Sequence, residues 1–87
     1  MPEPSPIARE GRAAFAKQLR EVRMHQGLTQ EAVAHAAGLD RSFYVEVETG
    51  KHSIALDRVF DLAEALRVSA KQLVPDVPVG TPVEDWT

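Results

Sequence analysis

The stretch Gln30–Thr49, QEAVAHAAGLDRSFYVEVET, decides the fold of this chain. It holds two short segments with helical apolar spacing, joined around Gly38. Ala34 is small enough to let one helix cross closely over the other. Gly38 can adopt the left-handed conformation that ends a helix, and the side chain of Asp40 can accept from the first free amides of the next helix. The stretch therefore predicts two helices joined by a tight turn, the second spanning residues 40–49.

The sequence before this stretch predicts a first helix. Ser5 is a suitable cap and Pro6 suits the first helical position. Apolar residues then keep helical spacing as far as His25. Gly11 weakens the prediction that this helix is continuous before residue 12. Gly27 ends the helix, and Thr29 caps the next one.

The sequence after the stretch predicts two more helices and a tail. Residues 56–66 have the clearest helical period, and Ser69 can cap a short fifth helix that ends at Leu73 or Val74. The chain is thus predicted to be all-α, with five helices and no strand pattern. We divide it into an N-terminal arm with the start of the first helix (1–18), a helix-turn-helix domain (19–74, motif 30–49) and a Pro-rich extended or disordered tail (75–87).

Residues 38–51, GLDRSFYVEVETGK, resemble the controller proteins of restriction–modification systems, which read GLDR-(Ser/Thr)-Tyr-Ile at this place. More broadly, the chain from about Leu19 to Leu73 resembles the Cro and phage-repressor family. The resemblance implies a five-helix, lambda-repressor-like DNA-binding domain. It also implies a transcriptional regulator that binds a palindromic operator as a homodimer, with helix 40–49 in the major groove.

Composition narrows the class of protein. The 87 residues make one domain, and the absence of Cys excludes disulfides and thiolate metal sites. No apolar run approaches the roughly 18 residues needed to span a bilayer, and residues 1–12 lack the apolar core of a secretory signal. We therefore expect a cytoplasmic protein.

The net charge of −3 is unusual for a DNA-binding domain, which is commonly basic. Residues 1–26 carry +2, residues 27–52 carry −2 and residues 53–87 carry −3. DNA binding would then depend on directed contacts, on dimerisation and on backbone amides rather than on a broad positive field.

The first turn of helix 40–49 holds the best candidates for base reading. Arg41 can donate two hydrogen bonds to guanine, and Ser42 can contact a base or a phosphate; a surface Arg41 paired with Glu31 or Asp40 is the alternative. Further along, Val45 could contact a thymine methyl, and Glu46 could accept from cytosine or repel phosphate at wrong sites.

The resemblance implies further DNA contacts. Gln30 would bond a phosphate at a helix N-terminus, and the alternative is a solvated surface amide. Phe43 offers stacking or apolar contact, and Thr49 stands where many relatives have Arg. After the helix, a loop with Gly50 could bind the sugar–phosphate backbone through Lys51, His52 and Ser53.

The resemblance also implies a buried ion pair between Arg23 and Glu48. The guanidinium of Arg23 would bind both carboxylate oxygens and so fix the angle between two helices. The alternative is that the two residues are unrelated surface charges. Tyr44 replaces the branched aliphatic residue usual at its packing position. For dimerisation we expect an apolar edge made of Leu66, Val68, Leu73, Val74 and Trp86.

No catalytic or metal chemistry is indicated. The three histidines are far apart and lack metal-ligand spacing, and neither a nucleophile–base pair nor a Gly-rich phosphate loop occurs. We expect a non-enzymatic protein without a cofactor, metal, membrane contact or small-molecule ligand. The competing interpretation is a protein-interaction or antitoxin-type module on the same fold, with weak or no DNA binding of its own.

Overall fold

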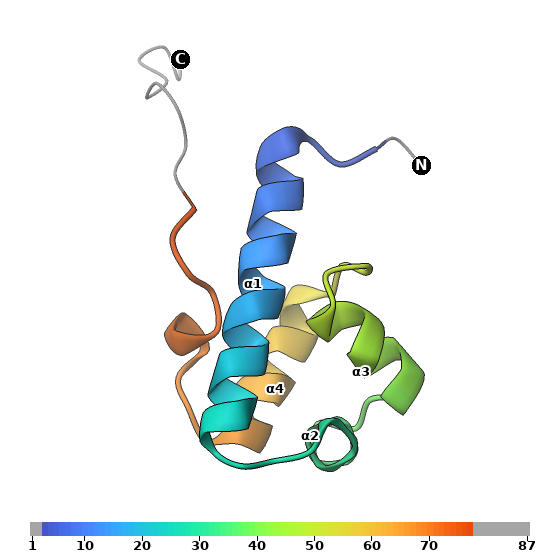
Figure 1. Cartoon of the computed structure of the whole chain (residues 1–87), viewed down its shortest axis with the longest axis vertical. Coiled ribbons are helices and arrows are strands. Elements are labelled where there is room, and N and C mark those ends of the chain that lie inside the picture. Colours follow the sequence, from blue (N-terminus) through green and yellow to red (C-terminus); the bar gives the residue numbers. More distant parts are fainter. Residues whose placement is uncertain (1–2, 78–87) are drawn as a thin grey trace.

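The computed structural model describes residues 3–77, which contain helices and no β-strand. The elements are α1 (Pro6–His25), α2 (Gln30–Ala36), α3 (Arg41–Glu48), α4 (Leu56–Leu66) and a 3-10 turn, η1 (Ala70–Gln72). In Figure 1, α1 stands along the long axis with α4 behind it, while α2 and α3 lie together on one side. The predicted all-α class is confirmed.

Helix α1 begins where the sequence predicted and is continuous through Gly11. The Oγ of Ser5 accepts a hydrogen bond from the amide of Ala8 over 3.1 Å, and Pro6 occupies the first turn, where it has no amide bond to lose. Gly27, at φ +70°, turns the chain out of the helix. Gly11, the one glycine inside α1, therefore does not interrupt the helix.

The hydrophobic core lies between α1, α2, α3 and α4. Leu19, Tyr44 and Leu62 are fully buried at its centre. The remaining core side chains are Phe15, Val33, Ala34, Ala37, Val47, Val59, Ala63, Leu66 and Leu73. Ala34, on the buried side of α2, and Ala37, which follows the helix as its cap, are both small, which allows α2 and α3 to pack closely.

The predicted fifth helix is a single 3-10 turn. Ser69 and Gln72 form a reciprocal capping box around it, and Leu73 follows, fully buried. Pro75 has no amide and disfavours a helical conformation in the residue before it, so the segment is too short for an α-helix. Gln18 donates to the carbonyl of Gln72 over 2.7 Å, which fastens the turn to α1.

Beyond η1 the chain runs back along α1. A Cβ added at Gly11 would lie 3.9 Å from a methyl group of Val77. Residues 75–77 are not helical, as expected. The rest of the predicted tail, including Trp86, lies outside the described residues.

Candidate nucleic-acid interface

The turn between α2 and α3 has the geometry that the sequence predicted. Gly38 has φ +71°, and the amide of Leu39 donates to the carbonyl of Ala34 over 2.8 Å. Asp40 caps α3, since its carboxylate accepts from the amide of Phe43 over 3.2 Å. The helix itself is Arg41–Glu48, one residue shorter at each end than predicted, because Asp40 and Thr49 are its caps.

Helix α3 has one buried and one exposed side. Tyr44, Val47 and Glu48 point into the protein, while Phe43 and Val45 are half-buried. The exposed side chains are Arg41, Ser42, Glu46 and Thr49. The exposed side therefore begins with a cation and a hydroxyl at the first turn of the helix.

Arg41 is free of the partners considered from the sequence. Within residues 3–77 no ion pair joins it to Glu31 or Asp40. Both it and Ser42 are exposed. The guanidinium is therefore available to a ligand outside the protein.

The hydroxyl of Thr49 is turned back onto its own helix. Its Oγ1 lies 2.9 Å from the carbonyl oxygen of Val45 and 3.2 Å from that of Glu46, so the hydroxyl hydrogen is shared between these acceptors. Thr49 can then accept a hydrogen bond from a base or offer its methyl group, but it has no hydrogen left to donate to phosphate.

The loop after α3 is held by backbone bonds. The amides of Lys51 and His52 both donate to the carbonyl of Glu46, over 2.9 and 3.2 Å, and the amide of Gly50 donates to Val47. The ring of His52 packs edge-on against Phe43, with 5.2 Å between centroids. These three amides are occupied, so an anion at this loop would be bound by the exposed side chains of Lys51, His52 and Ser53.

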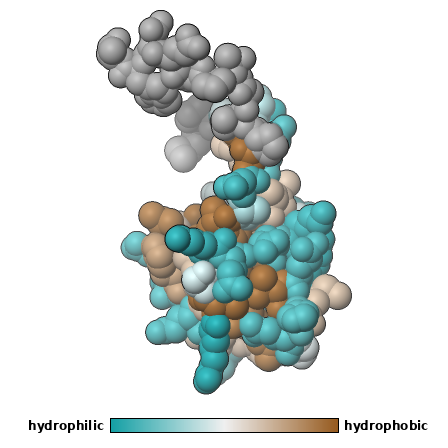
Figure 2. Space-filling model, turned by 90° about the vertical axis from the view of Figure 1, so that its left-hand side faces the viewer, coloured by the Kyte–Doolittle hydropathy of each residue, from teal (hydrophilic) through white to brown (hydrophobic). Residues whose placement is uncertain are grey.

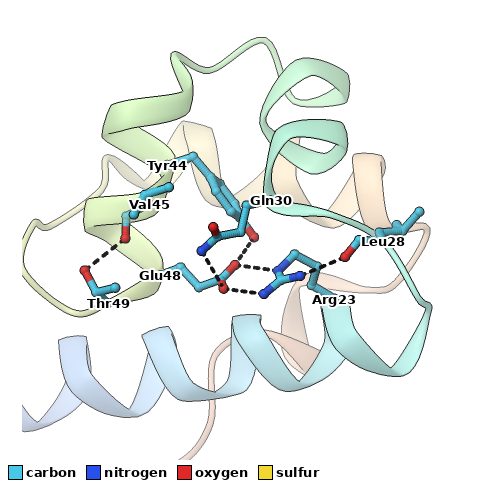
Figure 3. A network of polar contacts seen from close by, with 7 residues as sticks. All are labelled: Arg23, Leu28, Gln30, Tyr44, Val45, Glu48 and Thr49. Carbon is cyan, nitrogen blue, oxygen red and sulfur yellow. Dashed lines mark hydrogen bonds and ion pairs between the residues drawn. The ribbon is translucent and has the colours of Figure 1, made fainter.

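A buried ion pair fastens α3 to α1 (Figure 3). Nε of Arg23 donates to Oε2 of Glu48 over 2.8 Å, and its NH2 group donates to Oε1 over 2.7 Å. The remaining NH1 group donates to the carbonyl of Leu28 over 2.7 Å, in the turn that leads into α2. The pair expected from the resemblance is thus present, and Glu48 is 1% exposed. One guanidinium connects α1, the α1–α2 turn and α3.

Two further side chains complete the carboxylate's hydrogen bonds. Tyr44 donates its hydroxyl to Oε2 of Glu48 over 2.5 Å, and the amide of Gln30 donates to Oε1 over 3.2 Å. Each oxygen of Glu48 therefore accepts two hydrogen bonds, which is its full capacity. The sequence had indicated Tyr44 only as an unusual packing residue. Its spacing of four residues from Glu48 was the signal available for this bond.

The network controls the ionisation of its members. Burial raises the pKa of Glu48, but the hydrogen bonds from Arg23, Tyr44 and Gln30 outweigh it and leave that pKa below its ordinary value. Burial and the bond to Glu48 raise the pKa of Tyr44 far above its ordinary value. The bond to Glu48 likewise raises the pKa of Arg23. At neutral pH the pair is charged and the phenol is neutral.

Gln30 connects the network to the surface. It opens α2 and is half-buried, and Glu48 can only accept, so the amide nitrogen must be the atom that faces the carboxylate. That nitrogen carries a second hydrogen, which the bond to Glu48 does not use. Gln30 thus has an oriented donor left at the first turn of α2.

The expected dimer residues are not one surface. Leu66 and Leu73 are fully buried in the protein's own core, so their assignment to a dimer interface was wrong. Val68 is half-buried against that core. Val74 is exposed, and Trp86 lies outside the described residues. The sequence pattern showed that these residues are apolar but not which of them the monomer itself buries.

Neither a membrane span nor a metal cluster occurs in the part of the chain that the structure describes. No helix there is long and apolar enough to cross a bilayer. No group of three or more His, Asp or Glu side chains in residues 3–77 is placed to hold a metal ion.

Comparison with known proteins identifies the class. Residues 19–73 match the family model described as HTH_3: Helix-turn-helix, and the chain belongs to this family of DNA-binding helix-turn-helix transcription regulators. It is 36% identical over 74 residues to a Neisseria hypothetical transcription factor from Neisseria meningitidis, covering 85% of this chain and 70% of the relative.

Controller proteins are among the relatives. The crystal structure of the restriction–modification controller protein C.AhdI from Aeromonas hydrophila superposes with a TM-score of 0.69 at 39% identity, covering 70% of this chain and 92% of that one. Control protein C.BamHI from Bacillus amyloliquefaciens is 27% identical over 70 residues, covering 79% of this chain and 86% of the relative.

Proposed function

We propose that this protein is a sequence-specific transcriptional regulator that binds a palindromic operator as a homodimer, with α3 in the major groove. The exposed first turn of α3 is the observation that carries the proposal. Arg41 and Ser42 are exposed there, and neither side chain has a hydrogen bond or an ion pair within residues 3–77. The position of their helix is fixed by the buried pair of Glu48 and Arg23. The relatives named as a transcription factor and as controller proteins support the same function.

The exposed side of α3 offers chemistry for reading bases. Arg41 would donate two hydrogen bonds to a guanine, and Ser42 would contact a base or the backbone beside it. Val45 would meet a thymine methyl, and Glu46 would accept from a cytosine amino group or exclude wrong sequences. Thr49, whose hydroxyl hydrogen is already shared, would act as an acceptor or by its methyl group.

Side chains on either side of α3 would bind the backbone. Gln30 would give its second amide hydrogen to a phosphate, aided by the dipole of α2. Lys51, His52 and Ser53 would contact the strand beyond the other end of α3. Phe43 would act mainly by supporting the ring of His52.

A homodimer would place two copies of α3 about 34 Å apart, one turn of DNA. The surface that we assign to dimerisation consists of Leu56, Phe60 and Val74, which are 68%, 57% and 53% exposed. They line one apolar hollow beside η1, together with Val59 and Ala70. Figure 2, seen from the side of η1, shows brown apolar surface among the polar side chains. A second copy would cover these side chains.

Selection of bound duplexes from a random pool tests the proposal. We expect enrichment of an inverted repeat whose half-sites are one helical turn apart. If no common sequence is recovered, the proposal is contradicted and a protein-interaction or antitoxin-type module is favoured. The exposed apolar surface and the net charge of −3 would also suit such a module.

A further inference from the structure

Arginines are concentrated on one face of α1. The arginines of this helix follow one another at intervals of three, eight and three residues: Arg9, Arg12, Arg20 and Arg23. Ala13 and Ala16 lie between them in the sequence. Such spacing keeps all six side chains near one face of a helix. Glu10 and Glu21 each come one residue after an arginine, about 100° further round the helix. The carboxylates of α1 are therefore kept off the arginine face.

This face of α1 is turned toward α3 and the loop that follows it. Arg23 bonds Glu48 at the end of α3. A Cβ on Gly50 would lie 3.8 Å from the Cβ of Ala16 and 3.9 Å from the Cα of Ala13. The loop at Gly50 thus crosses α1 beside Arg12, which directly precedes Ala13.

Arg12 is adjacent to the loop side chains that we assign to the DNA backbone. It lines a hollow together with His52 and Ser53. The apolar walls of this hollow include Leu56 and Val74 of the surface assigned to dimerisation, so Arg12 lies between that surface and the loop. Arg9 lies one turn further along α1 and is exposed. Its partner Glu3 is 3.7 Å away and has an 88% exposed side chain, and such a surface pair contributes little. Arg9 and Arg12 therefore extend the positive charge of Lys51 along the molecule.

We propose that Arg9 and Arg12 are DNA-binding residues that contact phosphates next to those bound by the Lys51–Ser53 loop. The inference rests on the proposed function. Both residues precede the stretch matched by the family model, residues 19–73, so this contact surface would be an addition to the helix-turn-helix domain. It would also help an acidic protein to bind DNA, because Arg9 and Arg12 lie on a face of α1 from which the carboxylates of that helix are kept away. Phosphate suits these guanidinium groups, which can donate two parallel hydrogen bonds.

The salt dependence of operator binding tests this contact surface, with Arg9→Gln and Arg12→Gln as variants. Each phosphate contact contributes about 0.9 to the slope of log affinity against log salt, so each substitution should lower the slope by about 1.8 in a homodimer. Between 50 and 200 mM salt, the ratio of the wild-type affinity to the variant affinity should fall roughly tenfold. Base preference should stay the same, because phosphate contacts carry no sequence information.

Lys17→Gln is the matched control. Lys17 is exposed and shares the face of Glu10 and Glu21, at intervals of seven and four residues, so the same loss of charge there should leave the slope unchanged. Ethylation of individual phosphates gives a second measurement. Ethylation of the phosphates that Arg9 and Arg12 contact should block operator binding by the wild type. It should have no effect on binding by the Arg9 and Arg12 variants, which lack these contacts.

The outcomes separate this inference from the function on which it rests. If the wild type binds its operator and both arginine variants keep its slope, the inference is wrong and the proposed function stands. A weaker dimer with an unchanged slope would mean that the arginines meet acidic groups of the second copy, which also overturns the inference. If the wild type binds no selected duplex, both proposals fall.

Discussion

The hydroxyl of Tyr44 donates to Oε2 of Glu48, one turn further along α3, across 2.5 Å. The same oxygen accepts from Nε of Arg23, so the phenol completes the coordination of a carboxylate that is 1% exposed. A buried charge is costly unless its hydrogen bonds are satisfied. Tyr44 therefore supports the helix that carries the exposed base-reading candidates, although it faces the opposite side of that helix.

Replacing Tyr44 with Phe should destabilise the protein by about 1.5–3 kcal/mol, the range for a hydrogen bond to a charged group. The ring would still fill the core, while one lone pair of Glu48 would lose its donor. Unfolding in urea measures the change. Ser42→Ala removes an exposed hydroxyl from the same helix and should change stability by less than about 0.5 kcal/mol. Equal effects of the two substitutions would contradict the role given to Tyr44.

Glu48→Ala should cost about 3–5 kcal/mol, because it leaves the guanidinium of Arg23 buried without its partner. The side chain of Arg23 is 13% exposed, so water can replace little of the lost interaction. The same urea titration measures the loss. A change below about 0.5 kcal/mol would show that the pair is solvated and does not hold α1 against α3.

The ion pair should make stability depend on pH in the acid range. The pKa of Glu48 is lower in the folded protein than its ordinary value of 4.5, so folding favours the ionised form. The stabilisation is therefore complete above about pH 4.5 and is lost as the pH falls through the lowered pKa. Unfolding free energies of the wild type and of Glu48→Gln should differ by a constant amount near neutral pH and converge in acid. A difference that grows on acidification would contradict this sign.

Phe60→Ser should weaken the dimer without unfolding the monomer, because its side chain is 57% exposed at the surface assigned to dimerisation. Sedimentation equilibrium measures the dimer constant. Met24 is 62% exposed near the end of α1, and Met24→Ser serves as the control that should leave dimerisation unchanged. A wild type that stays at 9.6 kDa at every concentration would rule out the homodimer.

Much of the fold could be predicted because local signals agreed with one another. The expected caps are all found, namely Ser5, Thr29 and Asp40, and Pro6 occupies the first turn of α1 as predicted. Gly27 and Gly38 both take positive φ at the turns they were expected to form. The fifth helix was overestimated, since the short distance between Ser69 and Pro75 leaves room only for a 3-10 turn.

Apart from the local bond between Tyr44 and Glu48, the missed features depend on contacts between distant parts of the chain. Apolar spacing marks Leu66, Leu73 and Val74 alike, but only packing decides that the first two are core and the third is exposed. The bond from Gln30 to Glu48 joins residues 18 apart and needs the helix crossing to be known.

The effect of Arg41→Ala on base preference tests the central claim most directly. Affinities of the wild type and the variant should be compared on the selected operator and on operators with single base-pair changes. We predict a loss of about 1–3 kcal/mol per half-site, together with relaxed preference at one G·C pair, whereas Lys51→Ala should weaken binding to all sequences alike. If Arg41→Ala keeps the base preference of the wild type at every position, α3 does not read the operator through its first turn, and the account is contradicted.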